Sequence, residues 1–312
     1  MAVNNSLQRT SQKRLGIGSY LTGDAVKQRI NQVIGGKDGQ RFISAVVSAV
    51  QTNPGLQECT NQSILSAALL GESLKLSPSP QLGQYYMVPF NDRERGKVAQ
   101  FQLGYKGYIQ LAIRSGQYKK LNVLAIKDGE LIKFDPLNEE IEVKLIEDEE
   151  QREAAETIGY YAMFEYTNGF RKAIYWSKKK MLAHADKYSQ AFSANGGTVK
   201  TRYGEKTKVS YSDYVAGNFD PKDAWMYSSF WYKDFDGMAY KTMLRQLISK
   251  WGIMSIDMAS AIDADMAVIN DDGTKDYVDN DPDVIDMEPV SEPAQEAPAE
   301  DIQSALFGGD GQ

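Results

Sequence analysis

Few side chains in this sequence could support metal or nucleophilic chemistry. The chain of 312 residues contains one histidine, His184, and one cysteine, Cys59. A zinc site needs several His or Cys ligands at fixed spacing and a disulfide needs two cysteines, so one chain can form neither. His184 lies on a predicted helix beside Lys180 and Lys187, which favours a surface or phosphate-contacting role over catalysis.

Two carboxylates could still form a magnesium site. Asp234 and Asp236 come just before the last predicted helix. In a strand, residues i and i+2 share a face and could hold a metal ion together. At the start of a helix, carboxylates more often cap the helix and meet its dipole. We therefore expect capping here, and a magnesium-dependent nuclease remains the enzyme alternative.

The sequence lacks the loop with which many proteins bind the phosphates of ATP. That loop has the pattern G-x-x-x-x-G-K-[ST], in which backbone N–H groups surround the phosphates and the lysine reaches them. Two Gly-Lys pairs are present, but Gly36-Lys37 is followed by Asp38 and Gly96-Lys97 by Val98. We therefore expect no ATP-driven step and no required cofactor, with Mg²⁺ as a modulator at most.

The pattern that points to a function is basic residues interleaved with aromatic ones. Cations neutralise phosphates and flat side chains stack on bases, which together serve single-stranded nucleic acid binding. The alternative is core packing, and most of the 18 tyrosines must serve that purpose. The candidate DNA-binding residues are Tyr105, Lys106, Tyr108, Arg114, Lys119, Lys120, Arg171, Lys172, Lys178, Lys179, Lys180, Lys241 and Arg245.

Two of these groups have informative spacing. Lys241 and Arg245 are spaced i, i+4 on the last long helix, so they share a face. Lys178, Lys179 and Lys180 stand at a predicted helix N-terminus, where a positive charge opposes the helix dipole. Three lysines at that place suggest an anionic partner.

The net charge of −7 hides a strong asymmetry. Residues 271–312 carry thirteen acids and one base, a net charge of −12, while the remainder has 34 bases and 29 acids, a net charge of +5. A basic body with an acidic tail points to nucleic acid or membrane partners, and a solubilising tail is the alternative. No apolar run reaches the roughly 18 residues of a membrane helix, so we expect no membrane partner. The single cysteine indicates a reducing compartment, most simply the cytoplasm.

Hydrophobic periodicity and turn residues predict an α+β fold. Hairpins are expected around the loop at 91–97 and around Asn168-Gly169, and Asp128-Gly129 is a turn signal between two further strands. Thr60 or Asn61 and Ser177 are expected helix caps. Residues 189–221 show no period and predict an irregular segment. The expected helices are 24–34, 40–52, 61–76, 105–115, 177–188, 222–232 and 235–251, and the expected strands are 84–90, 98–103, 118–127, 130–134, 158–166 and 170–176.

Three segments resemble the RecT family of phage and prophage single-strand annealing proteins. They are LGQYYMVPF from Leu82, FQLGYKGYIQLAIRSGQYK from Phe101 and MAYKTMLRQLISKWG from Met238. The resemblance covers roughly residues 40–252, apart from about 193–220. By residue match, it implies that Lys106, Arg114, Lys119, Lys241 and Arg245 bind DNA.

The resemblance also implies what the protein does. It implies an ATP-independent recombinase, not an enzyme, that coats single-stranded DNA as a homo-oligomer and anneals complementary strands in the cytoplasm of a bacterial host. It implies a compact domain of antiparallel β-hairpins packed with helices, which oligomerises into rings or filaments. The expected partners are single-stranded DNA, the annealed duplex intermediate, a phage exonuclease and a host single-strand-binding protein. A nuclease and a phage structural or adaptor protein remain as alternatives.

These observations predict three regions along the chain. Residues 1–20 are expected to form a flexible N-terminus, and residues 21–256 the DNA-binding, annealing and oligomerisation domain. Within that domain, residues 193–220 are expected to be a flexible insertion. Residues 257–312 are expected to form an acidic, largely disordered tail, because they combine Pro, Glu and Asp with few large apolar residues.

Overall fold

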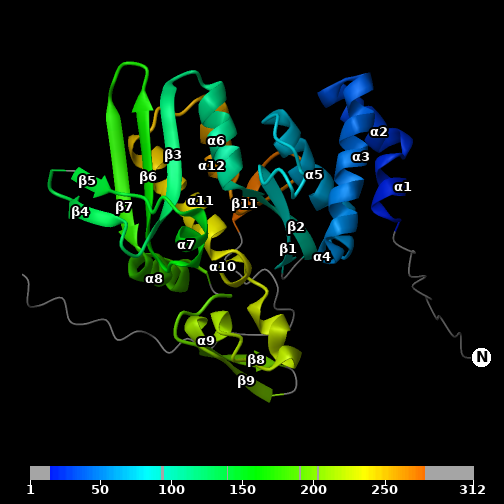
Figure 1. Ribbon diagram of the computed structural model, residues 1–312. Helices are drawn as coiled ribbons and strands as arrows, with labels where there is room; N and C mark the ends of the chain where they lie inside the picture. The colour runs from blue at the N-terminus through cyan, green and yellow to red at the C-terminus, as the bar shows by residue number, and fades with distance from the viewer. Residues whose placement is uncertain (1–14, 93–94, 139, 190, 202–203, 278–312) are drawn as a thin grey trace, which may run out of the picture.

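A group of helices packed on a β-hairpin forms one half of the fold (Figure 1). The protein is described from a computed structural model, which covers residues 15–92, 95–138, 140–189, 191–201 and 204–277. The hairpin confirms the prediction for the loop at 91–97. The elements of this half are α1 (Ile17–Leu21), α2 (Asp24–Ile34), α3 (Gly36–Thr52), α4 (Pro54–Gln57), α5 (Asn61–Ser73), β1 (Tyr85–Asp92), β2 (Gly96–Leu103) and α6 (Tyr105–Arg114).

Helix α5 is the buried centre of this half. Thr60 caps it, because its side chain accepts a hydrogen bond from the backbone N–H of Ser63, as the sequence predicted. Ile64, Leu65 and Ala68 of α5 are at most 1 % exposed. The helix packs against β2, so a helix buried on most of its sides anchors the hairpin.

A three-stranded antiparallel sheet forms the other half. It is made of β3 (Tyr118–Lys127), β6 (Thr157–Tyr166) and β7 (Arg171–Ser177), in the order β3-β6-β7. The predicted hairpin at Asn168-Gly169 joins β6 to β7, and Gly169 has a φ of +88°. Alternate β6 side chains, such as Tyr160 and Phe164, are buried under α8 (Lys178–Tyr188) and α11 (Phe235–Trp251).

The Asp128-Gly129 turn does not join a hairpin, which corrects the expectation for this segment. Gly129 has the positive φ expected of the turn, at +84°. However, β3 pairs with β6, while β4 (Leu131–Asp135) pairs with β5 (Glu140–Val143) as a separate ribbon. The buried carboxylate of Glu130 fixes the position of this ribbon relative to β3. It accepts hydrogen bonds from the backbone N–H groups of Lys127 and Ile146 and from Arg152. Arg152 belongs to α7 (Glu149–Ala154), which the sequence did not predict.

Residues 193–220 contain regular elements, which corrects the expectation of an irregular segment. They form the ribbon β8 (Gly197–Thr201) and β9 (Gly204–Lys208) and the helix α9 (Tyr211–Val215). Aromatic side chains connect the segment to the body, and the rings of Tyr214 and Tyr232 lie 4.9 Å apart. The predicted helix 222–232 is divided into a 3₁₀ helix, η1 (Pro221–Tyr227), and α10 (Phe230–Lys233), because Ser229 caps a new turn.

The body extends beyond residue 256, where the sequence placed the start of a tail. Helix α12 (Ile256–Ala264) buries Met258, Ala261 and Ala264 in the first core, and β10 (Ala267–Ile269) pairs with β2. Strand β11 (Lys275–Tyr277) pairs with β10. Residues 278–312 and most of the predicted flexible N-terminus lie outside the described residues, but α1 begins at Ile17 and buries Leu21.

Helix α11 belongs to both hydrophobic cores. Leu244 and Ile248 pack with the helices and hairpin of the first half. Ala239, Met243 and Leu247 pack with the β3-β6-β7 sheet and α8. The two halves are therefore fused along one helix. No helix within the described ranges is long and apolar enough to cross a membrane.

Candidate nucleic-acid interface

A buried carboxylate lies where α11 meets the hairpin half. Asp265, directly after α12, is 2 % exposed. It accepts hydrogen bonds from Lys241 Nζ at 2.9 Å and from Arg245 Nη1 at 2.6 Å. It also accepts the backbone N–H of Leu103, at the end of β2, at 2.9 Å. Lys241 and Arg245 therefore share a helix face as their spacing predicted, but this face meets a counter-ion inside the protein.

Arg245 is the more accessible cation of this cluster. Its side chain is 39 % exposed, against 10 % for Lys241. Burial works to lower the pKa of Arg245, but Tyr108 and Asp265 outweigh it, so that the pKa is raised. Burial, followed by the charge of Asp265, raises the pKa of the Tyr108 hydroxyl. Arg245 could meet a phosphate with little rearrangement, whereas Lys241 and Tyr108 are covered; their DNA-binding role stays a prediction.

Two glycines allow α6 to begin directly against another backbone segment. Gly104 precedes the helix and Gly107 lies in its first turn. A Cβ atom on Gly104 would overlap the carbonyl oxygen of Gly83, and one on Gly107 would overlap that of Gln84. The close approach fixes the position from which Lys106 projects. Lys106 is exposed, and its Nζ lies 5.9 Å from the ring centre of the neighbouring Tyr105.

Basic side chains at the starts of β3 and β7, on either side of β6, surround the carboxylate of Glu165. Lys119 Nζ lies 2.6 Å and Lys120 Nζ 3.5 Å from its oxygens. Arg171 stands opposite Glu165 in the strand register. The hydrogen bond from Lys119, helped by Lys120, lowers the pKa of Glu165. Both lysine side chains are more than half exposed, so this corner presents excess positive charge to solvent.

Two of the predicted bases make contacts inside the fold. Arg114 Nη2 donates to the carbonyl oxygen of Leu74 at 2.6 Å. Lys172 is buried, and its Nζ lies 3.6 Å from the centre of the Trp251 ring, which is a cation–π contact. These contacts hold segments of the fold together. Lys172 is covered by the fold, whereas Arg114 remains exposed.

The N-terminus of α8 carries three lysines in different situations. Ser177 caps the helix as predicted, since its hydroxyl accepts the backbone N–H of Lys180 at 3.2 Å. Lys178 pairs with Glu156 at 3.1 Å, and Lys180 Nζ lies 4.3 Å from the Trp176 ring centre. Lys179 is exposed. The cap and the aromatic contact thus compensate for positive charge at the positive end of the helix dipole.

Three rings form a row along α8 that sequence reasoning missed. Trp176 and His184 have ring centres 5.4 Å apart, and His184 and Tyr188 have ring centres 4.6 Å apart. Burial, followed by the charge of Lys180, lowers the pKa of His184, which keeps the imidazole neutral at pH 7. The i, i+4 spacing of Lys180, His184 and Tyr188 was the available signal. Tyr188 is 64 % exposed, whereas Trp176 and His184 are half-buried and Trp176 packs against the core of the second half.

Of the Asp234 and Asp236 pair, Asp234 caps a helix as predicted, whereas Asp236 lies in its first turn and does not cap it. Asp234 accepts the backbone N–H of Gly237 at 2.9 Å and caps α11. Asp236 accepts the hydroxyl of Tyr160 at 2.6 Å. The two carboxylates therefore have separate structural partners.

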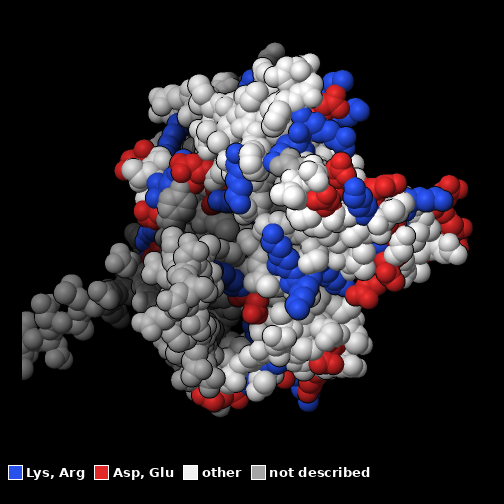
Figure 2. Space-filling view, turned by 90° about the vertical axis from the view of Figure 1, so that its left-hand side faces the viewer, with Lys and Arg blue, Asp and Glu red and all other residues white. Residues whose placement is uncertain are grey.

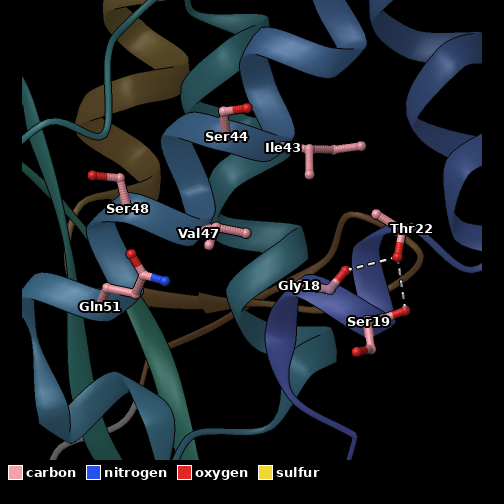
Figure 3. A pocket seen from close by; sticks show the side chains of 8 residues that line it. All are labelled: Gly18, Ser19, Thr22, Ile43, Ser44, Val47, Ser48 and Gln51. Atoms are coloured by element: carbon pink, nitrogen blue, oxygen red, sulfur yellow. Dashed lines mark hydrogen bonds between the residues drawn. The ribbon is translucent and has the colours of Figure 1, made fainter.

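The pocket between α1 and α3 is lined by side chains that could not act as catalytic acids, bases or nucleophile-activating groups (Figure 3). It is a groove of about 570 Å³, and the side chains that face it are hydroxyl, amide or aliphatic groups, with no ionisable group among them. Thr22 donates its hydroxyl hydrogen to backbone carbonyls of α1 rather than pointing it into the groove. The groove therefore offers little to an anionic ligand.

The predicted basic residues do not form one compact site. One group lies around Asp265, at the seam where α11 joins the two cores. A second group lies at the corner of β3 and β7, and a third forms a row along α8. Figure 2 shows lysines and arginines spread over one side of the molecule, with acids among them both on its upper and central surface and on the projecting part. Basic groups spread over such an area suit an extended polyanion better than a small ligand.

The fold and these surfaces define an α+β protein that displays bases and aromatic rings over an extended area. The chain belongs to the RecT family, whose family model matches residues 40–283. Family membership implies single-strand annealing in recombination, and proteins of this family are annealing proteins rather than catalytic enzymes.

Two curated proteins show the relationship. The uncharacterized protein YqaK of Bacillus subtilis (strain 168) is 35 % identical over 314 residues, which covers 96 % of this chain and 92 % of YqaK. Protein RecT of Escherichia coli (strain K12) is 31 % identical over 133 residues, which covers 42 % of this chain and 48 % of that protein. The resemblance found in the three sequence segments is thereby confirmed at the level of the family.

Proposed function

We propose that this chain coats single-stranded DNA as an oligomer and anneals complementary strands without ATP, in the cytoplasm of the bacterium that carries it. The observation that supports this proposal is the row of rings and lysines along α8, together with the exposed bases at the β3–β7 corner. Rings and cations side by side serve single-stranded DNA better than duplex, in which the bases are already stacked.

The proposed mechanism needs no bond to be made or broken. Lysine and arginine side chains neutralise the DNA phosphates, which lowers the repulsion between two strands. The edges of the nucleobases stay free to pair. A second strand then samples registers, and correct pairing adds stacking of about 1.4 kcal/mol per step. Matched duplex is thus selected by its own stability. Neither a nucleotide nor a metal is required, and Mg²⁺ would modulate annealing by screening phosphates.

The proposal is tested by annealing in EDTA. Two complementary oligonucleotides with a donor and an acceptor dye are mixed with the protein without ATP, and duplex formation is followed by energy transfer. We expect faster annealing than without protein. Annealing that appears only when ATP is added contradicts the proposal. Shortened oligonucleotides on a denaturing gel after Mg²⁺ is added support the nuclease alternative, although the separate partners of Asp234 and Asp236 do not favour it.

The partner proteins also stay proposals. A phage exonuclease would supply the single strand, and a host single-strand-binding protein would occupy it first. Binding of either protein to the full chain, compared with a chain that ends at residue 277, tests whether the acidic residues 278–312 recruit them.

A further inference from the structure

A patch of apolar side chains is exposed at the end of α11. Phe170, Trp251, Ile253, Met254 and Ile256 are between 43 % and 86 % exposed. Exposed apolar residues are ordinary when scattered, but a contiguous group of large ones marks a contact surface. We call these five side chains the apical patch.

Short contacts connect the members of the apical patch. The rings of Phe170 and Tyr166 stack with centres 5.8 Å apart, and the Tyr166 hydroxyl donates to the carbonyl oxygen of Trp251 at 3.2 Å. The Tyr118 hydroxyl donates to the carbonyl oxygen of Ile253 at 3.0 Å. Met254 and Ile256 continue the same segment. Because β3 and β6 hold the segment by its backbone, its side chains remain directed outward.

The chemistry of the apical patch fits a protein better than DNA. DNA offers phosphates and flat bases, and three of the five side chains are aliphatic. The ionisable residues around it are the bases Lys119, Lys120, Arg171, Lys172 and Lys250 and the acids Glu165 and Asp257. A partner that covers it should therefore be apolar with an acidic border.

This chain carries such a surface on the β4–β5 ribbon. Ile132, Phe134 and Leu137 are 58 %, 44 % and 88 % exposed. The ribbon contributes the acids Asp135, Glu140 and Glu142 against the bases Lys133 and Lys144. Lys133 pairs with Glu140 at 2.6 Å, so the ribbon combines large apolar side chains with a small excess of acidic groups on one projecting element.

The ribbon and the apical patch of one chain lie at opposite ends of β7. Phe134 packs against Tyr175, with ring centres 5.0 Å apart, while Phe170 precedes the other end of the strand. Five residue steps of extended strand lead from Phe170 to Tyr175, about 16 Å at roughly 3.3 Å per step. Glu130 and Arg152 anchor the base of the ribbon. The complementary surfaces are therefore placed to meet between two copies.

We propose that the β4–β5 ribbon of one copy docks on the apical patch of the next copy. A contact between two different surfaces repeats head to tail, and it produces a ring if it closes and a filament if it does not. This inference deepens the proposed coating of DNA, because it names the contact between neighbouring subunits. Its test uses no DNA, so it can fail while annealing is observed, and annealing can fail while it holds.

The test compares two single variants and their mixture. Ile256→Asp alters the apical patch and Leu137→Asp alters the ribbon, and both side chains are more than 85 % exposed, so folding should not change. Val215→Asp, at an exposed residue of α9 outside both surfaces, is the matched control. Sedimentation velocity of the full-length proteins, without DNA or nucleotide, measures association.

The wild type and Val215→Asp should form a series of oligomers as concentration rises. Each of the other two variants should need at least about tenfold more protein for the same average mass. An equimolar mixture of the two should form dimers and stop there, because one intact patch meets one intact ribbon.

Three results would overturn the proposal. They are a monomeric wild type at every soluble concentration, unchanged association in either variant, and a mixture that fails to form dimers.

Discussion

The carboxylate of Asp265 stabilises the seam where α11 joins the two cores. It is the buried counter-ion of Lys241 and holds Arg245 and the end of β2. Asp265→Asn leaves the buried ammonium group of Lys241 without its opposite charge. Because removal of one partner of a buried pair costs about 3–5 kcal/mol, we expect the free energy of unfolding in urea to fall by roughly that amount.

Asp263→Asn is the matched control for that substitution. Asp263 lies in the last turn of α12, two residues before Asp265, and pairs with Lys275, but its side chain is 65 % exposed. A surface ion pair contributes about 0–1 kcal/mol, so this variant should remain close to the wild type. Equal losses of unfolding free energy in the two variants would show that the buried charge pair stabilises the protein no more than the surface pair does.

His184 should titrate below the ordinary histidine pKa. Burial and Lys180 favour the neutral ring in the folded protein, while in the unfolded chain the pKa returns to about 6.5. Between the folded-state pKa and the unfolded-state pKa, the unfolded chain binds more protons than the folded protein. This residue therefore lowers the free energy of unfolding as the pH falls through about 6.5. NMR of the one histidine gives its pKa directly. A value at or above 6.5, or the same pH dependence of unfolding in His184→Gln, would contradict this expectation.

Individual residues were predicted from sequence when their partners are local. Ser177, Thr60 and Asp234 cap helices that begin immediately after them, and local spacing was enough to identify them. The shared face of Lys241 and Arg245 was equally visible. Their counter-ion was not, because Asp265 lies 20 residues beyond Arg245 and reaches it only through the packing of α12.

At the scale of an element, α6 depends on Gly107. An added Cβ would overlap the carbonyl oxygen of Gln84, and backbone cannot move aside as a flexible side chain can. We expect Gly107→Ala to lower the free energy of unfolding by more than about 1–3 kcal/mol, the usual cost of overpacking. Thermal or urea unfolding followed by circular dichroism measures the loss.

A second helix provides the comparison for Gly107. Gly18 lies in α1, where an added Cβ would meet only Val47 Cγ2 at 4.0 Å. Gly18→Ala should therefore leave stability unchanged or raise it by up to about 1 kcal/mol through better helix propensity. A loss of stability in Gly18→Ala comparable to that in Gly107→Ala would mean that close approach is not the cause.

Helix α8 should supply part of the salt dependence of DNA binding. Each phosphate contact to a single strand contributes about 0.7 to the slope of log affinity against log salt concentration. Replacing Lys179 and Lys180 with Ala should therefore reduce the slope by about 1.4 if both contact phosphates. Fluorescence anisotropy of a labelled oligonucleotide at several salt concentrations measures it. Replacing Lys27 and Lys222, which are exposed and lie outside α8 and the ribbon, is the control, and an equal change there would argue against a specific role of α8.

Elements were predicted well where their pattern is local, but strand partners were not. The hairpins around 91–97 and Asn168-Gly169 have strands that pair with their nearest neighbours. Asp128-Gly129 forms the predicted turn, yet β3 pairs with β6, about thirty residues later. A turn residue determines the direction of the chain and carries no information about which strand will cover the exposed edge.

For the whole molecule, the sharing of α11 predicts that the two cores unfold together. Cys59 is buried in the first core, and all four tryptophans come at or after residue 176. The reactivity of the Cys59 thiol therefore reports opening of the first half, and tryptophan fluorescence reports changes in the second. We expect both to change at the same urea concentration. Separate midpoints would show that the halves are independent units.

The position of β10 also determines where the chain can be shortened. The composition of the sequence places the end of the body at residue 256, but a chain cut there would lose Asp265 and the strand that covers part of β2. The buried Lys241 would then lack its counter-ion, and β2 would become an open edge that can pair with other molecules. Such a truncated protein should aggregate during expression, whereas one that ends after Tyr277 keeps the edge covered.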